Sequence, residues 1–241
     1  MHIQQEKFTL PKAESWQMFN AISSKYDPLN HLLSLGLDYG WRRSLTIWLP
    51  NRRKLKLLDL ATGTGDVLIT LLKRSSDIES ACGIDLADAM LKIAQQKVQT
   101  AHLTEKISLQ HGDAGQIPYP SENFDVVTMA FGIRNIPVPE KVLSEIFRVL
   151  KKNGRVVILE FSLAPNRIFR SLQLFYLRHI VPAIGAMISG NFQAYRYLNQ
   201  TIEKFPYGEA FCNLLETAGF QIVSAQPLTF GIATIYKGDK I

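Results

Sequence analysis

The sequence is poor in cysteine, and its first residues lack the charged-then-apolar pattern of a secretory leader. Its 241 residues include two cysteines, Cys82 and Cys212, which are far apart and lie in apolar surroundings. The opening segment, MHIQQEKFTLPK, contains no apolar stretch of the length that a signal peptide needs. We therefore expect a reduced, cytoplasmic protein rather than a disulfide-stabilised secreted one.

Uninterrupted apolar runs long enough to span a membrane are also missing. A spanning helix needs about 20 predominantly apolar residues. The nearest segment, residues 168–190, is interrupted by Arg170, Arg178 and His179. Internal repeats and low-complexity tracts are absent as well. We expect one main domain that does not cross a membrane, with attachment to a membrane surface left open.

Acidic residues are in the minority, and the basic excess is concentrated near the N-terminus. The chain has a net charge of +6, and residues 1–56 hold nine Lys or Arg against four Asp or Glu. Such a surface attracts nucleic acid or anionic lipid over long distances. A solvated face in front of the first strand explains the same charges without any partner. The charge pattern alone leaves these three alternatives open.

From residue 55 onward, short apolar runs alternate with segments of helical periodicity. This succession predicts an α/β fold whose mostly parallel sheet has helices on both faces. The last two strands are joined by the short linker QPLTFG, so we expect them to pair as an antiparallel hairpin. The predicted strands span residues 55–60, 80–85, 107–110, 124–130, 155–161, 221–225 and 232–236, and the predicted helices span residues 66–73, 87–98, 139–150 and 207–218.

Two regions fall outside this alternation and are predicted to form helical caps. Residues 1–54 contain all three tryptophans and have helical patterns that end near Pro50. Residues 163–205 are rich in aromatic and aliphatic side chains at helical spacing. Because ligands of open α/β sheets bind beyond the carboxyl ends of the strands, we expect both caps there. The predicted division is an N-terminal cap, 1–54, and a cofactor-binding domain, 55–241, with the second cap inserted at about 163–205.

A glycine-containing loop follows the first predicted strand. The segment LLDLATGTGDV, residues 57–67, has glycines at positions 63 and 65. Gly63 and Gly65 let the backbone turn tightly and approach a ligand, while the next helix directs its first amides into the same space. A dinucleotide fingerprint needs a third small residue, where this chain has Leu68. The loop therefore indicates a nucleoside cofactor other than a nicotinamide dinucleotide.

Three acids define the expected cofactor more closely. Asp85 ends the second strand, where its carboxylate can accept both ribose hydroxyls or cap the next helix. Asp113 can pair with the exocyclic amine of adenine while the amide of Ala114 pairs with a ring nitrogen. Asp66 stands at a helix start, where its charge would repel a pyrophosphate and attract an ammonium group. S-adenosylmethionine has these groups and no phosphate, so it is the predicted cofactor; no metal site is predicted.

At the level of longer motifs, the sequence resembles the ubiquinone/menaquinone biosynthesis C-methyltransferases, a family of class I methyltransferases. The resemblance covers nearly the whole chain. The generic part is the glycine loop, and the more specific part is GIRN followed by RVLKKNGRVVILEFS together with an N-terminal YDPLN. The segments that carry it are YDPLNHLLSLGLDYGWRR, LLDLATGTGD, FGIRNIPVPEKVLSEIFRVLKKNGRVVILEFS, AYRYLNQTIEKFP and LLETAGF.

This resemblance implies a Rossmann-like class I fold and transfer of the S-adenosylmethionine methyl group to a ring carbon of a polyprenylated hydroquinone such as demethylmenaquinol. By motif position it places cofactor contacts at Thr64, Asp85, Asp113 and Ala114. Three positions depart from the family pattern: Ala130 replaces a serine, Leu29 a methionine and Asp38 a histidine. The last departure puts a histidine base at that position in doubt.

The implied chemistry needs a phenolate, because a ring carbon is a weak nucleophile until the neighbouring hydroxyl loses its proton. Arg134 would stabilise the phenolate and Asn135 would orient a hydroxyl, unless they form only a surface ion pair and a turn. We rank a water held by Arg134 first as proton acceptor and Asp27 second. The other candidates in the two caps are His31, Asp38, Tyr195 and Tyr197.

Other functions and partners remain to be weighed. A benzoquinol of ubiquinone biosynthesis would share these motifs, and an RNA methyltransferase would share the cofactor loop but needs an RNA-binding module that is not evident. A non-catalytic relative would lose the cofactor acids, which are present here. We expect a polyprenylated quinol as partner, no nucleic acid, peripheral contact with the inner face of the cell membrane, and a homodimer.

Overall fold

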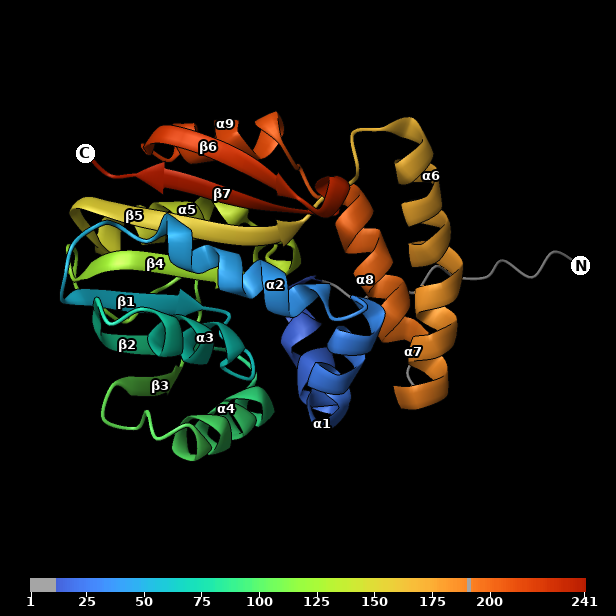
Figure 1. Cartoon of the computed structure of the whole chain (residues 1–241), viewed down its shortest axis with the longest axis horizontal. Coiled ribbons are helices and arrows are strands. Elements are labelled where there is room, and N and C mark those ends of the chain that lie inside the picture. Colours follow the sequence, from blue (N-terminus) through green and yellow to red (C-terminus); the bar gives the residue numbers. More distant parts are fainter. Residues whose placement is uncertain (1–11, 190–191) are drawn as a thin grey trace, which may run out of the picture.

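A seven-stranded sheet forms the centre of the computed structural model, which describes residues 12–189 and 192–241 (Figure 1). The strand order is β3-β2-β1-β4-β5-β7-β6. β7 runs antiparallel to both β5 and β6, and all other neighbouring strands are parallel to one another. This arrangement confirms the predicted mostly parallel sheet with an antiparallel hairpin at its C-terminal end. The strands are β1 (Leu55–Leu60), β2 (Ile78–Asp85), β3 (Ile107–His111), β4 (Phe124–Ala130), β5 (Leu150–Phe161), β6 (Gln221–Leu228) and β7 (Ala233–Asp239).

Helices cover both faces of the sheet, which explains why its central strands are almost continuously apolar. Side chains of β1 and β4 are nearly all buried. On one face, helices α5 and α9 pack around Phe124 and Tyr236; on the other, α3 packs around Leu57. These helices are α3 (Asp66–Arg74), α4 (Asp88–Thr100), α5 (Pro139–Val149) and α9 (Glu209–Thr217), close to the predicted bounds.

The remaining helices lie beyond the carboxyl ends of the parallel strands (Figure 1). Ile22 and Leu29 of the first cap pack with Leu177, Val181 and Ile202 of the second, so the two caps share one apolar cluster. The division at residues 54 and 55 stays a prediction, and residues 1–11 and 190–191 lie outside the described ones. The cap helices are α1 (Ser15–Leu33), α2 (Leu37–Ser44), α6 (Arg167–Phe175), the π-helical turn η4 (Tyr176–Ile180), α7 (Val181–Ser189) and α8 (Phe192–Lys204).

Helices α6, η4 and α7 follow one another without a break. Among the described residues, the segment Arg167–Ile188 is the one helix long and apolar enough to cross a membrane, with a mean hydropathy of 1.2. Arg170 and Arg178 therefore do not by themselves exclude a span by length and composition, and the expectation that the segment does not cross a membrane stays a prediction. In the structure one side of the helix packs on the protein, and Leu177 and Val181 are buried there.

Candidate active site

A cavity of about 260 Å³ lies at the carboxyl ends of β1, β2 and β4. Its wall on the sheet side includes Gly63 from the glycine loop and Asp85 from the end of β2. Helix α1 supplies the opposite wall with Trp16 and Phe19. The N-terminal cap therefore closes the site that the strand ends form, as its predicted position implies. We call this space the cofactor cavity.

Asp85 is fixed at the rim of the cofactor cavity by two backbone amides. Its Oδ2 accepts a hydrogen bond from the amide of Gly63 at 2.8 Å, and its Oδ1 accepts one from the amide of Ala87 at 2.8 Å. Burial raises the pKa of Asp85, while these amide hydrogen bonds act against the rise. The carboxylate thus holds the amide at the N-terminal end of α4 and also lines the cavity, and its contact with a ribose stays a prediction.

Asp113 and Ala114 line the same cavity, directly after β3. Asp113 Oδ1 accepts a hydrogen bond from the amide of Gly115 at 2.7 Å, which holds this loop in a tight turn. The other carboxylate oxygen makes no hydrogen bond to the described residues that would compete with a ligand. The structure thus brings Gly63, Asp85, Asp113 and Ala114, which come from three separate stretches of sequence, together around one space.

The glycine loop turns through backbone conformations that favour glycine. Gly63 has a φ of +56° and Gly65 a φ of +82°, in the left-handed region. A Cβ on Gly65 would also lie only 3.2 Å from the Cβ of Ala94 on α4. Gly65 does not line the cavity; its role is to let the chain pass from the loop into α3 against α4.

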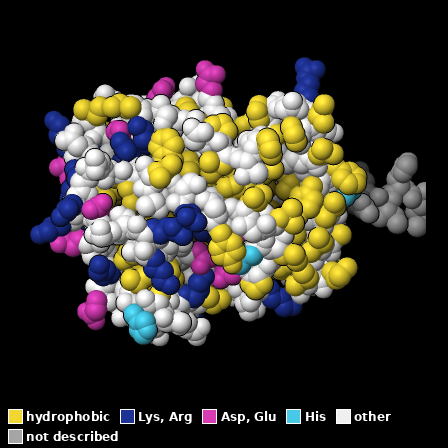
Figure 2. All heavy atoms as spheres, in the orientation of Figure 1, with side chains coloured by type: hydrophobic (Ala, Val, Ile, Leu, Met, Phe, Trp, Pro, Cys, Tyr) yellow, Lys and Arg dark blue, Asp and Glu magenta, His cyan; other side chains and the backbone are white. Residues whose placement is uncertain are grey.

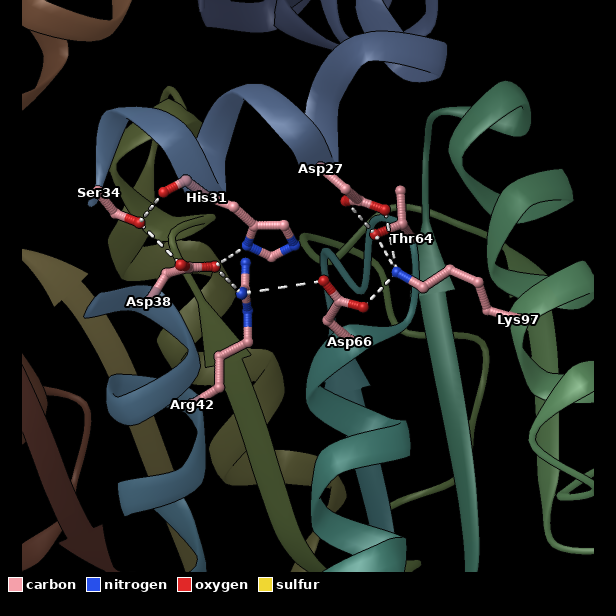
Figure 3. A network of polar contacts seen from close by, with 8 residues as sticks. All are labelled: Asp27, His31, Ser34, Asp38, Arg42, Thr64, Asp66 and Lys97. Atoms are coloured by element: carbon pink, nitrogen blue, oxygen red, sulfur yellow. Dashed lines mark hydrogen bonds and ion pairs between the residues drawn. The ribbon is translucent and has the colours of Figure 1, made fainter. Parts of the chain in front are cut away.

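Thr64 and Asp66 are turned away from the cofactor cavity toward a polar network (Figure 3). Thr64 Oγ1 donates a hydrogen bond to Asp27 Oδ1 at 2.7 Å. Lys97 of α4 donates to Asp27 Oδ2 at 3.0 Å and forms an ion pair with Asp66. Lys97 neutralises Asp66 in this arrangement, and the contacts of Thr64 and Asp66 with a cofactor stay predictions.

Asp27 lies in the same network and lines neither this cavity nor the second one described below. Its two oxygens contact Thr64 and Lys97, which ties α1 to the glycine loop and to α4. In this arrangement Asp27 fixes the cap, and its role as a proton acceptor stays a prediction. Sequence spacing could not reveal this, since Lys97 lies 70 residues away.

A second part of the network surrounds Asp38 of α2 (Figure 3). His31 Nδ1 lies 2.7 Å from Asp38 Oδ2, Ser34 donates to Asp38 Oδ1 at 2.7 Å, and Arg42 forms an ion pair with Asp38. Burial alone would raise the pKa of Asp38, but the bond from Ser34 and the charge of Arg42 outweigh it, so the pKa lies below its usual value. Where the family resemblance leads us to expect a histidine, the structure has an aspartate that holds the imidazole of His31.

A second, apolar cavity of about 320 Å³ adjoins the cofactor cavity. Four residues line both spaces, which places the two side by side. Further lining comes from apolar side chains of both caps and from Trp41 and Phe161. The shared residues are Phe19, Tyr26, Phe131 and Asn135. We call this space the apolar cavity.

Two polar atoms in the wall of the apolar cavity have no hydrogen-bond partner among the described residues: Arg134 Nε and Asn135 Oδ1. The hydroxyl of Tyr197 lies in the same wall and interacts with the side chain of Ser15. Both unpartnered atoms are buried, and a buried polar atom without a partner costs about 1–3 kcal/mol. A polar ligand with two hydroxyl groups could satisfy a donor and an acceptor of this kind. The cavity is therefore apolar in bulk but has polar groups where it approaches the cofactor cavity.

The guanidinium of Arg134 is held in place by an ion pair with a fully buried acid. Its Nη1 donates to Glu160 Oε1 at 2.7 Å and to the carbonyl oxygen of Phe131 at 2.5 Å. Burial raises the pKa of Glu160, and the Arg134 guanidinium opposes that rise. The alternative of a surface ion pair for Arg134 is wrong, because Arg134 is 3% exposed and Glu160 is not exposed. The pair fixes the guanidinium while leaving Nε free.

Sequence reasoning missed Phe131 and Glu160. Phe131 lines both cavities, packs 4.5 Å from the Phe161 ring centroid, and has a φ of +57°, which a non-glycine residue rarely adopts. A charged residue inside the apolar strand RVVILEF was the available signal for Glu160. Tyr195 was another candidate for the proton acceptor, and its side chain is not among those that the structure describes.

The described residues contain no group of three or more His, Cys, Asp or Glu that could hold a metal ion.

Comparison with known proteins agrees with this geometry. The ubiE/COQ5 methyltransferase family model matches residues 8–240. The chain belongs to this family. As a member of the ubiE/COQ5 family it is a methyltransferase, and its cofactor is S-adenosylmethionine, as predicted from the glycine loop and the three strand ends.

Named relatives in the ubiE/COQ5 family are similar over nearly their full length. A demethylmenaquinone methyltransferase of Bacteroides fragilis is 42% identical over 226 residues, which cover 93% of this chain and 91% of that protein. The corresponding enzyme of Thermus thermophilus is 42% identical over 92% of this chain and 100% of its own length. A ubiquinone/menaquinone biosynthesis C-methyltransferase of Geobacter sulfurreducens is 40% identical over 92% and 87%.

Solved structures confirm the predicted fold class. A methyltransferase from Thermotoga maritima, described as S-adenosylmethionine-dependent, superposes with a TM-score of 0.66 at 18% identity, covering 94% of this chain and all of that chain. A second such enzyme, from Aquifex aeolicus, gives a TM-score of 0.60 at 19% identity, covering 83% of this chain and 89% of that chain. The ubiE/COQ5 member described here therefore has the class I methyltransferase fold.

Proposed function

We propose that this protein transfers the methyl group of S-adenosylmethionine to a ring carbon of demethylmenaquinol, a polyprenylated naphthoquinol, and so produces menaquinol. The names of the Bacteroides and Thermus relatives support this substrate. The observation that carries the proposal is the pair of unpartnered polar atoms of Arg134 and Asn135 in an apolar cavity beside the cofactor cavity. A polar ring with an apolar tail matches that combination.

The cofactor cavity fits a nucleoside that carries no phosphate. Asp85 would accept the ribose hydroxyls, and Asp113 with the amide of Ala114 would hold the adenine edge. When bound, S-adenosylmethionine supplies a methyl group on a positively charged sulfur, which is already a good leaving group. The chain therefore needs to align the acceptor carbon with that methyl group and to exclude water.

Arg134 and Asn135 carry the acceptor half of the mechanism. Asn135 Oδ1 accepts a hydrogen bond from a quinol hydroxyl and orients the ring, and the hydroxyl proton passes to water. The N–H of Arg134 then stabilises the phenolate oxygen. Negative charge delocalises to the ortho carbon, which forms the new bond to methyl, and the proton on that carbon leaves to restore the aromatic ring. Arginine stays protonated throughout, so it acts as an electrostatic partner and not as the base.

Three further parts of the partner prediction remain proposals. The substrate is lipid-soluble, so we propose that the enzyme is cytoplasmic and works in contact with the inner face of the cell membrane. We propose that it has no nucleic-acid partner, since the apolar cavity fits a lipid and not a base. The homodimer is likewise kept as a proposal, to be tested by the mass of the protein in solution.

Rates with matched acceptors test this function. The acceptor is 2-demethyl naphthoquinone with a prenyl tail, offered in its reduced and its oxidised form, with a prenylated benzoquinol and total RNA in parallel. Transfer to the reduced naphthoquinone alone supports both the substrate and the need for a phenolate. Faster transfer to the benzoquinol would move the substrate to ubiquinone biosynthesis, and transfer to RNA would overturn the proposal.

A further inference from the structure

The outward side of the α6–α7 helix carries several large exposed apolar side chains, with His179 packed against Phe175 among them. Leu177 and Val181 face the protein, while the opposite side presents Ile168, Phe175 and Met187 with exposed fractions of 72%, 58% and 85%. A surface helix ordinarily shows polar residues on its outer side. Figure 2 shows hydrophobic side chains gathered over the part of the molecule where Figure 1 places α6 and α7. We call this outer side, defined by Ile168, Leu172, Phe175 and Met187, the α6–α7 face.

The apolar cavity opens beside this face. Several residues of its lining are themselves exposed: Leu35 is 78% exposed, Phe230 is 72% exposed, and Leu172 on the α6–α7 face is 61% exposed. Phe169 of α6 and Phe230 stack with their ring centroids 5.0 Å apart at this rim. A tail leaving the cavity between these side chains would emerge on an apolar surface and not in water.

Positive charge is concentrated in the same two caps. Residues 12–44 and 163–204 together hold nine Lys or Arg and four Asp or Glu, so they account for most of the net charge of +6. The idea of one basic N-terminal face needs correction, however. Arg52 pairs with Asp125, and Lys56 hydrogen-bonds Asn123, both at the amino ends of the strands and away from the caps. The charge that accompanies the α6–α7 face is therefore that of the caps.

The packing of the helix favours a position in the plane of a membrane surface over a span. Arg178 lies midway along Arg167–Ile188 and donates to both oxygens of Glu203 on α8, at 3.0 and 2.5 Å. A span would place these charges at the centre of the bilayer, which is costly. A helix in the interface buries one side and keeps its flanking charges in the headgroup layer.

We propose that the α6–α7 face inserts into one leaflet of an anionic phospholipid bilayer, so that the apolar cavity opens directly into the lipid and receives its substrate without passage through water. The docking surface is inferred from the exposure, the apolar character and the charge of the α6–α7 face, whereas delivery of a quinol through it rests on the proposed function. The proposed partner of this face is a lipid bilayer. Contact with a second copy of the chain is the competing outcome of the test.

Vesicle flotation of the full chain tests the docking surface. The probes are vesicles of phosphatidylglycerol and phosphatidylcholine in equal parts, compared with phosphatidylcholine alone. Phe175→Glu and Met187→Glu alter the face without touching the lining of the apolar cavity, and Ile222→Glu is the control, because Ile222 is 64% exposed on β6 at the far edge of the sheet. We expect each face variant to weaken binding by roughly tenfold or more, while the control binds as the original chain does.

A water-soluble demethyl naphthoquinol with a short tail separates this inference from the proposed function. The face variants should methylate it at the original rate but lose activity toward a long-tailed quinol held in vesicles. Equal vesicle binding by all four proteins, or a dimer that dissociates in the face variants without any lipid binding, would overturn the inference. Vesicle binding without methylation of either quinol would overturn the proposed function and leave the docking surface intact.

Discussion

At the scale of single residues, Asp85 is the side chain on which cofactor recognition most depends. Asp85→Ala should weaken S-adenosylmethionine binding by about 1–3 kcal/mol, since hydrogen bonds to a charged group are lost. Titration calorimetry measures this change directly. Asp88→Ala is the matched control, because Asp88 is exposed, lies three residues away and pairs only with His111 among the described ion pairs. Equal affinity in the two variants would remove the ribose assignment.

Tyr197 tests the polar end of the apolar cavity. Tyr197→Phe removes a buried hydroxyl that interacts with the side chain of Ser15, so the free energy of unfolding should change by about 1 kcal/mol at most. If that hydroxyl meets the quinol, kcat/KM should fall by roughly tenfold, the effect of one hydrogen bond of about 1.4 kcal/mol. Thermal melting and steady-state kinetics check the two halves. Tyr39→Phe, at an exposed position outside both cavities, should change neither.

Asp59 should make stability depend on pH. Burial raises its pKa to about 7 from an ordinary value of 3.8, although Thr128 Oγ1 donates a hydrogen bond to it at 2.6 Å. The folded state then binds more protons than the unfolded state between these values, so stability should fall as the pH rises from about 4 to about 7. The upper limit of the loss is about 4 kcal/mol.

The variant Asp59→Asn resembles the protonated acid and should flatten this part of the stability curve. Denaturant unfolding at pH 5 and at pH 8 measures the difference for each protein. The variant should be relatively more stable at the higher pH, and Asp88→Asn serves as the exposed control. If the free energy of unfolding changes with pH by the same amount in the original chain and in Asp59→Asn, Asp59 is ionised in the folded state.

At the scale of elements, Lys97 fastens three of them to one another. It links α4 to Asp27 on α1 and to Asp66 at the start of α3. Lys97→Met should reduce stability by about 1 kcal/mol and weaken cofactor binding severalfold, because α1 forms a wall of the cofactor cavity. Lys92→Met, at an exposed position on the same helix, is the control.

High salt distinguishes the ion pairs of Lys97 from its packing. Lys97 is 30% exposed, so screening by salt should weaken its ion pairs in the original chain. The differences in stability and in cofactor binding between the original chain and Lys97→Met should therefore become smaller. Binding and unfolding measured at low and high ionic strength give this comparison. A difference that is independent of salt would mean that the aliphatic stem, and not the charge, holds α1.

The elements themselves could be predicted to a large extent because their signals are local. Short apolar runs identified all seven strands, and helical periodicity identified α3, α4, α5 and α9. The ends of β2 and β3 also predicted that Asp85 and Asp113 lie close together, since residues that follow parallel strands meet at one edge of the sheet. Local patterns contain no information about partners far along the chain, so the contacts of Asp27 and Thr64 with Lys97 could not be predicted.

At the scale of the whole molecule, two cavities side by side explain why the caps exist. The strand ends alone form one wall of the cofactor cavity, and helix α1 supplies the other. The apolar cavity is made almost entirely by the caps, and its lining joins residues from α1, α6 and α8. Such a space depends on long-range packing, which is why the pattern of the sequence predicted the two caps but not the cavity between them.

The central claim is that a quinol ring occupies the polar end of the apolar cavity and receives a methyl group on carbon. One measurement tests it most directly: incubation with methyl-labelled S-adenosylmethionine and reduced prenylated 2-demethyl naphthoquinone, followed by location of the label by mass spectrometry. We expect one labelled methyl group on the ring carbon and an amount of S-adenosylhomocysteine equal to that of the methylated product. Label on a hydroxyl oxygen, or no transfer despite cofactor binding, would contradict it.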